Sequence, residues 1–112
     1  MGSGSSSEEV DMSSSVAQFV KEAIAAEPIV IFSKTSCPYC KMAKRVFDSL
    51  KQSYKAIELD DRDDAEDIQR VLAEITGAKT VPRVFYKGEC LGGGSDVKAL
   101  HESGKLQELL NA

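Results

Sequence analysis

The sequence predicts an α/β fold in which one mixed four-stranded sheet carries helices on both faces. Short apolar runs typical of strands alternate with longer segments whose apolar residues recur at helical spacing. In order, we expect a helix, a strand, a helix, a strand, a helix, two strands and two helices. A helix joins the first two strands, so the crossover rule makes them parallel and right-handed. At 112 residues the chain has room for one domain with a single modest core.

Apolar periodicity and chain-breaking residues place these elements. The first helix begins after the serine cluster at 13–15 and ends before Pro28, which disfavours helix at Glu27. The other helices are expected at 38–52, at 65–75, from 97 to about 102 and after Gly104. The strands are expected at 29–32, 54–59, 84–86 and 90–91, the last two forming an antiparallel hairpin.

Four local features carry more specific expectations. The acidic run at 60–64 lacks the glycine and terminal glutamate of a calcium loop, so its carboxylates are expected at a helix N-terminus, where negative charge is favoured. Glycines 92–94 call for unusual backbone angles or a close approach to the main chain. Ser95 and Asp96 are expected to cap the helix that follows. The helix at 65–75 is expected to end at Gly77 and to turn four residues inward: Ile68, Val71, Leu72 and Ile75.

Composition narrows the classes of function. A net charge of −4 and the absence of a basic tract argue against a nucleic-acid binder. No run approaches the roughly 20 apolar residues of a membrane span, and the N-terminus lacks the features of a signal peptide. Three cysteines without the spacing of a disulfide framework favour reduced thiols. We therefore expect a cytoplasmic monomer that binds neither nucleic acid nor membrane.

The first fifteen residues are rich in serine and glycine. Such a segment buries too little apolar surface to offset the entropy of ordering. Residues 1–15 are therefore expected to be a disordered tail, and residues 16–112 the folded domain. The opening residues formally match an N-myristoylation pattern at Gly2, but a serine-rich tail satisfies that short pattern easily by chance. A single acyl chain would anchor the protein only weakly.

Two cysteines, Cys37 and Cys40, lie where the first strand gives way to the second helix. Pro38 suits the first helical position, which puts Cys37 at about the N-cap, facing free backbone N–H groups and the positive end of the helix dipole. That position stabilises a thiolate, and Lys34 and Lys41 add positive charge nearby. Cys40, one turn into the helix, is placed to resolve a mixed disulfide on Cys37. The pair is therefore predicted to be redox-active.

Other uses of the pair fit less well. A structural zinc site needs a second ligand pair, and the remaining candidates, Cys90 and His101, are eleven residues apart. Haem attachment needs a histidine after the second cysteine, where Lys41 stands. We therefore expect no metal, and Cys90 is expected to be a small, semi-buried apolar residue.

Four separated motifs carry a resemblance to a known family: Lys34 with CPYC at 37–40, TGAK at 76–79, TVP at 80–82 and GGGSD at 92–96. In this order and spacing they are similar to the motifs of dithiol glutaredoxins, and the likeness runs from about Val16 to the C-terminus. The resemblance implies the thioredoxin-like form of the α/β fold. It also implies a glutathione-dependent thiol–disulfide oxidoreductase, with glutathione as co-substrate and with glutathionylated and disulfide-containing proteins as partners.

The resemblance further implies a glutathione site beside the catalytic Cys37 and Cys40. The backbone of Val81 pairs with the cysteinyl part of glutathione, and Pro82 resembles the family's cis-proline. Lysines and an amide receive the glycine carboxylate, and a helix N-terminus receives the γ-glutamyl group. Each of these residues also has an ordinary alternative role as a solvated side chain, a helix cap or a surface ring. The expected members are Lys34, Tyr39, Gln69, Lys79, Thr80, Val81, Pro82, Gly94, Ser95 and Asp96.

The expected chemistry uses Cys37 in two ways. Alone, it removes glutathione from a glutathionylated protein, and together with Cys40 it reduces protein disulfides. One alternative is a dimer that holds a [2Fe–2S] cluster through Cys37 and two glutathiones; the resemblance implies that Pro38 disfavours it. A thioredoxin proper is another alternative, against which the CPYC spacer and the absence of tryptophan argue.

Overall fold

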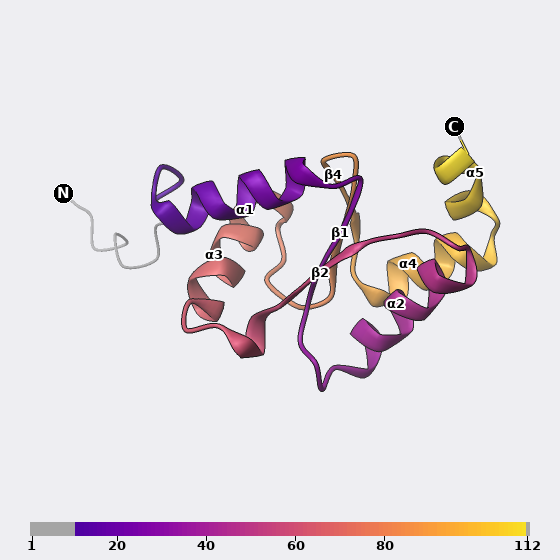
Figure 1. Ribbon diagram of the computed structural model, residues 1–112, viewed down its shortest axis with the longest axis horizontal. Coiled ribbons are helices and arrows are strands. Elements are labelled where there is room, and N and C mark those ends of the chain that lie inside the picture. The colour runs from indigo at the N-terminus through magenta and orange to yellow at the C-terminus, as the bar shows by residue number, and fades with distance from the viewer. Residues whose placement is uncertain (1–10, 112) are drawn as a thin grey trace.

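The computed structural model describes residues 11–111 (Figure 1). The match to the N-myristoylation pattern at Gly2 and most of the expected tail lie outside the described residues. Helix α1 (Ser15–Ala26) begins inside the segment expected to be a tail, and Met12 packs against the core. The Oγ of Ser14 accepts a hydrogen bond from the N–H of Ala17 at 3.1 Å, which confirms that the serine cluster starts this helix.

The sheet has the predicted mixed topology. Its strands are β1 (Ile29–Ser33), β2 (Lys55–Glu58), β3 (Arg83–Tyr86) and β4 (Glu89–Gly92), in the spatial order β2-β1-β3-β4. Strands β1 and β2 pair in parallel, whereas β3 pairs antiparallel with both β1 and β4.

Helices cover both faces of this sheet, as predicted (Figure 1). Helix α1 packs with α3 (Ala65–Thr76) on one face, and α2 (Pro38–Ser49) packs with α4 (Gly94–Glu102) on the other. The last helix, α5 (Lys105–Asn111), packs against α4. No helix within residues 11–111 is long and apolar enough to cross a membrane.

Strand β1 is buried on both faces and divides two apolar clusters. Val30 and Phe32 belong to the cluster under α1 and α3, where Phe32 meets Phe85 edge-to-face at 5.8 Å between ring centroids. Ile29 and Ile31 belong to the cluster under α2, α4 and α5. This two-sided burial explains why the strand is an unbroken apolar run in the sequence.

Two predicted element ends were too late in the chain. Helix α2 ends at Ser49 instead of 52, because Lys51 adopts a left-handed conformation with φ of 58° and the N–H of Gln52 bonds back to the carbonyl of Phe47 at 3.0 Å. Strand β2 ends at Glu58, because Leu59 begins a short 3₁₀ turn, η2 (Leu59–Asp61). The expected left-handed end of α3 at Gly77 is confirmed, with φ of 86°.

Two expectations about burial were wrong. Ile75 is 41% exposed, because it lies in the last turn of α3, beyond the apolar cluster that ends with Leu72. Cys90 is exposed instead of semi-buried, because β4 is an edge strand.

The start of α4 also differs from its prediction. The helix begins at Gly94, and its N-cap is Gly93 instead of Ser95. The chain already turns at Gly92, which has φ of 112°, so the helix starts earlier than the polar residues indicate. Asp96 still supports this end, because its carboxylate accepts a hydrogen bond from the N–H of Gly93 at 2.8 Å.

Candidate active site

Cys37 occupies the N-cap of α2, as predicted, and Pro38 is the first helical residue. The backbone N–H of Cys40 donates a hydrogen bond to Sγ of Cys37 at 3.2 Å. The sulfur therefore receives an N–H group that the helix leaves free and lies at the positive end of the helix dipole. Cys37 is also partly accessible to solvent, as an attacking sulfur must be.

Cys40 has the opposite environment. Its side chain is fully buried, and burial together with the hydrogen bond to Cys37 raises the pKa of the Cys40 thiol to about 11. At neutral pH Cys40 is therefore a thiol. Cys37 is thus the more accessible of the two sulfurs, and Cys40 lies one turn away as a buried thiol.

The loop before Cys37 is anchored by Asp60, a residue that was expected to lie at the N-terminus of the next helix. The carboxylate of Asp60, in η2, accepts hydrogen bonds from the N–H of Thr35 at 3.1 and 3.2 Å and from the Thr35 hydroxyl. These hydrogen bonds, with a smaller contribution from Lys34, hold the pKa of the Asp60 carboxyl below its usual value.

The expectation that the whole acidic run serves the start of α3 was therefore wrong for Asp60. Parallel pairing of β1 and β2 places Ser33 opposite Glu58, so the segments after both strands meet at one edge of the sheet. That pairing is the signal that could have identified the contact between Asp60 and Thr35.

The segment at 80–82 approaches Cys37 from across the fold. The Val81–Pro82 peptide bond is cis, as the resemblance implied, and Pro82 is buried. The carbonyl oxygen of Val81 lies 3.8 Å from Sγ of Cys37, although the two residues are 44 positions apart in the chain. Thr80 is exposed beside them. The structure thus brings the Val81 backbone to the reactive sulfur.

Tyr39, near the start of α2, lies against the first turn of α4. Tyr39 is 59% exposed, and a Cβ added at Gly94 would lie 2.8 Å from the Cβ of Tyr39. A glycine at 94 therefore lets the first turn of α4 approach the residues after Cys37. Ser95 and Asp96, in the same turn, are both exposed.

Gln69 and Lys79 are brought together as a separate pair. The side-chain amide of Gln69 donates a hydrogen bond to the carbonyl oxygen of Lys79 at 2.9 Å. Both residues line a hollow of about 400 Å³ together with Glu66 and Arg70. Lys34, expected to act with them, lies in the loop before Cys37 and does not line that hollow. The expected carboxylate ligands therefore fall into two groups.

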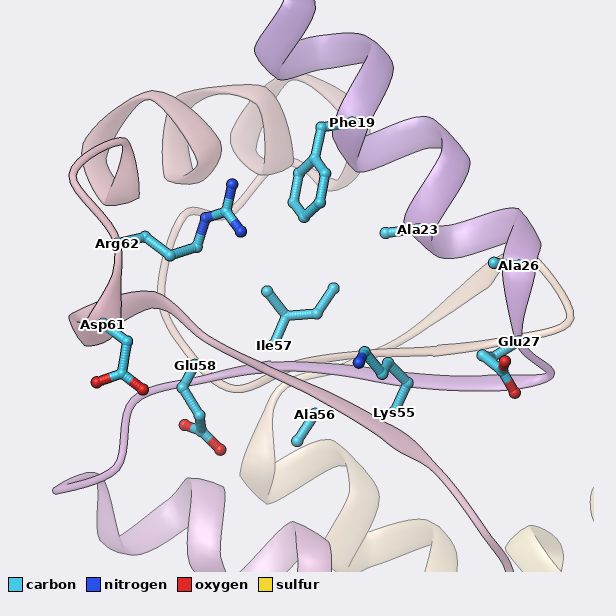
Figure 2. Close-up of a pocket in the computed structure, with 10 residues that line it drawn as sticks. All are labelled: Phe19, Ala23, Ala26, Glu27, Lys55, Ala56, Ile57, Glu58, Asp61 and Arg62. Carbon is cyan, nitrogen blue, oxygen red and sulfur yellow. The ribbon is translucent and has the colours of Figure 1, made fainter.

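A different hollow, of about 680 Å³, lies along the outer edge of β2 (Figure 2). Residues of α1 and β2 line it, and the Arg62 guanidinium stands 4.3 Å from the ring centroid of Phe19. It contains no cysteine and none of the expected site residues. The candidate active site is therefore the region around Cys37 and not this larger hollow.

The fold and this pair of cysteines define a thiol–disulfide oxidoreductase of thioredoxin-like architecture. The family model for glutaredoxin matches residues 29–91. The chain is 52% identical to glutaredoxin-C4 of Arabidopsis thaliana over 88% of this chain and 73% of that protein. It is 49% identical to the chloroplastic glutaredoxin-C4 of Oryza sativa subsp. japonica, over 80% of this chain and 68% of that protein.

Similarity to solved structures points to the same family. The crystal structure of a buckwheat glutaredoxin–glutathione complex matches with a TM-score of 0.82 at 41% identity, covering 86% of this chain and 87% of that one. The chain belongs to the glutaredoxin family. The predicted fold class and the predicted glutathione-dependent thiol–disulfide oxidoreductase activity are thereby confirmed.

Proposed function

We propose that Cys37 is the nucleophile and Cys40 the resolving thiol in the reduction of glutathione–protein mixed disulfides and of protein disulfides. The observation that carries this proposal is the placement of Cys37 Sγ, which receives the Cys40 N–H at 3.2 Å and lies 3.8 Å from the Val81 carbonyl oxygen. The sulfur thus lies at the start of a helix and beside the backbone of Val81, to which the cysteinyl part of a peptide substrate could pair.

The first route uses Cys37 alone. Its thiolate attacks the glutathione sulfur of the mixed disulfide, forms a Cys37–glutathione disulfide and releases the protein thiolate, which takes up a proton. The thiolate of a second glutathione then attacks the bound glutathione sulfur. Glutathione disulfide leaves, and the Cys37 thiolate is restored.

The second route uses both cysteines. Cys37 attacks a protein disulfide and becomes joined to one of its sulfurs while the other leaves as a thiolate. Cys40 then loses its proton and attacks Cys37 Sγ, which releases the reduced protein and leaves a Cys37–Cys40 disulfide. Two glutathiones reduce that bond and leave as glutathione disulfide.

The proposed glutathione site extends from Val81 in both directions. Val81, between Thr80 and the cis-proline Pro82, pairs with the cysteinyl part, and the turn of α4 that contains Gly94, Ser95 and Asp96 receives the γ-glutamyl group. Lys34, Gln69 and Lys79 receive the glycine carboxylate, and the exposed ring of Tyr39 packs on the substrate. Support comes from the approach of Val81 to Cys37, from the close approach of Gly94 to Tyr39 and from the buckwheat relative solved with glutathione.

The proposal is tested by comparing Cys37→Ser and Cys40→Ser with the wild type. The assay is glutathione-dependent turnover of a glutathionylated peptide. We expect Cys37→Ser to abolish turnover and Cys40→Ser to retain it, while reduction of a protein disulfide needs both cysteines. Turnover by the Cys37 variant at the wild-type rate would contradict the assignment.

Three further properties belong to the same proposal. The protein acts as a monomer in the cytoplasm, although relatives are named as chloroplastic and as mitochondrial. Its protein substrates are glutathionylated or disulfide-containing proteins. The comparisons do not favour the alternative of a glutathione-ligated [2Fe–2S] dimer. A visible absorption band in protein purified with glutathione would support that alternative.

A further inference from the structure

Arg83, the first residue of β3, is a buried charge close to the active site. Its exposed fraction is only 9%, and the ion pairs formed among residues 11–111 join other residues. Its Nε instead donates to the carbonyl oxygens of Thr80 at 3.0 Å and Pro82 at 3.3 Å. Burying a guanidinium with no carboxylate partner is costly, so this arrangement calls for a role.

The hydrogen bond from Arg83 to the Thr80 carbonyl oxygen fixes the orientation of the whole peptide unit between Thr80 and Val81. The Thr80 carbonyl and the Val81 N–H belong to one planar trans peptide unit, in which the C=O and N–H bonds point in opposite directions. A guanidinium that holds the Thr80 oxygen therefore directs the Val81 N–H away from Arg83. That N–H is a backbone group proposed to pair with glutathione, and the carbonyl of the same Val81 faces Cys37 Sγ.

The same guanidinium also reaches the start of α4. A Cβ added at Gly93, the N-cap of that helix, would lie 2.6 Å from Nη2 of Arg83. Gly93 has φ of −98°, which any residue adopts, so glycine is needed there for space and not for conformation. Arg83 thus lies between the loop proposed to pair with the cysteinyl part of glutathione and the helix turn proposed to receive its γ-glutamyl group.

We propose that Arg83 is a positioning residue for glutathione recognition. Its guanidinium locks the peptide unit between Thr80 and Val81 in the orientation that presents the Val81 N–H, and it sets the spacing between this loop and the N-terminus of α4. This inference rests on the proposed glutathione site. It assigns Arg83 no contact with the reacting sulfurs, so the chemistry of Cys37 itself does not depend on it.

The test measures preference for glutathione apart from the reactivity of Cys37. In a Cys40→Ser background, single-turnover rates are compared for one peptide carried as a mixed disulfide with glutathione or with cysteamine, which lacks the γ-glutamyl and glycine parts. Alkylation of Cys37 by iodoacetamide supplies a rate without any peptide recognition. Arg45→Met, at an exposed position on α2, controls for the loss of one positive charge.

We expect Arg83→Met to lower the preference for the glutathione disulfide about tenfold, with alkylation unchanged within about twofold. Arg83→Lys keeps the charge but not the planar guanidinium whose Nε donates to both carbonyl oxygens, and we expect it to recover only part of the preference. An unchanged preference in Arg83→Met, or a parallel fall in the alkylation rate, would overturn the proposal. A parent protein that does not distinguish the two disulfides would overturn the glutathione site itself.

A second variant, at Gly93, disturbs the position of the Arg83 guanidinium without removing it. Gly93→Ala places a methyl group 2.6 Å from Nη2 and should displace the guanidinium, so we expect a loss of preference in the same direction as that of Arg83→Met. Because methionine is too short to occupy that space, adding Gly93→Ala to Arg83→Met should cost little more. Fully additive losses would mean that the two residues act independently and would contradict the proposed coupling.

Discussion

The backbone N–H of Cys40 lies 3.2 Å from Sγ of Cys37, so one residue of the pair supports the reactive state of the other. The same residue keeps its own thiol buried, with a pKa of about 11. Two cysteines one helical turn apart thus have opposite environments, one at the accessible end of the helix and one in the interior, which disfavours an anion.

The raised pKa of Cys40 predicts a pH dependence for the dithiol route. At pH 7 only about one Cys40 in ten thousand is a thiolate, and this fraction rises tenfold per pH unit until pH approaches 11. Burial, the largest cause of the shift, persists while Cys37 is bonded to a substrate. We therefore expect release of peptide from a preformed Cys37–peptide disulfide to accelerate steeply from pH 6 to pH 9, as measured by stopped flow.

The control for that experiment is the Cys40→Ser protein, which should release no peptide without added thiol. A release rate that stays flat across pH 6–9 in the wild type would mean that Cys40 is not buried as the structure has it.

Asp60 predicts a second effect on activity. Asp60→Asn weakens the hydrogen bonds that fix Thr35, and the loop that carries Lys34 toward Cys37 loses its anchor. We expect turnover of a glutathionylated peptide to fall about threefold, a modest effect because the contact is exposed to solvent. Asp61→Asn, at an exposed neighbour in the same turn, is the matched control and should leave turnover unchanged. Equal effects of the two substitutions would argue against the anchor.

Phe47 predicts the cost of disturbing the core behind the active site. Its side chain is fully buried in the cluster under α2, and its ring packs at 6.4 Å from that of Tyr54. Truncation by Phe47→Ala should lower the free energy of unfolding by about 3–5 kcal/mol, measured by urea denaturation. A loss below about 1 kcal/mol would mean that this region is not packed as described.

The sequence predicts the architecture because its signals are local. The unbroken apolar run at 29–32 indicates a strand that is buried on both faces. The helical spacing of Val46, Phe47 and Leu50 indicates the helix that covers one of these faces. Cys37 could be placed at an N-cap for the same reason, since Pro38 marks the first turn within the sequence itself.

Contacts between distant segments could not be read in this way. Asp60 looks like one of several carboxylates before a helix, and only the pairing of β1 with β2 shows that it meets Thr35. Arg83 looks like an ordinary strand residue, because nothing in its neighbours shows that its side chain turns back to Thr80 and toward Gly93. Ile75 follows the apolar period of α3 yet lies past the end of the core.

The most direct test traps the central intermediate. The Cys40→Ser protein is incubated with a glutathionylated peptide, and the products are analysed by intact mass and peptide mapping. The account predicts that one glutathione becomes attached to Cys37 while the peptide leaves as a free thiol. Attachment of the peptide to Cys37, or of glutathione to Cys90 in its place, would contradict it.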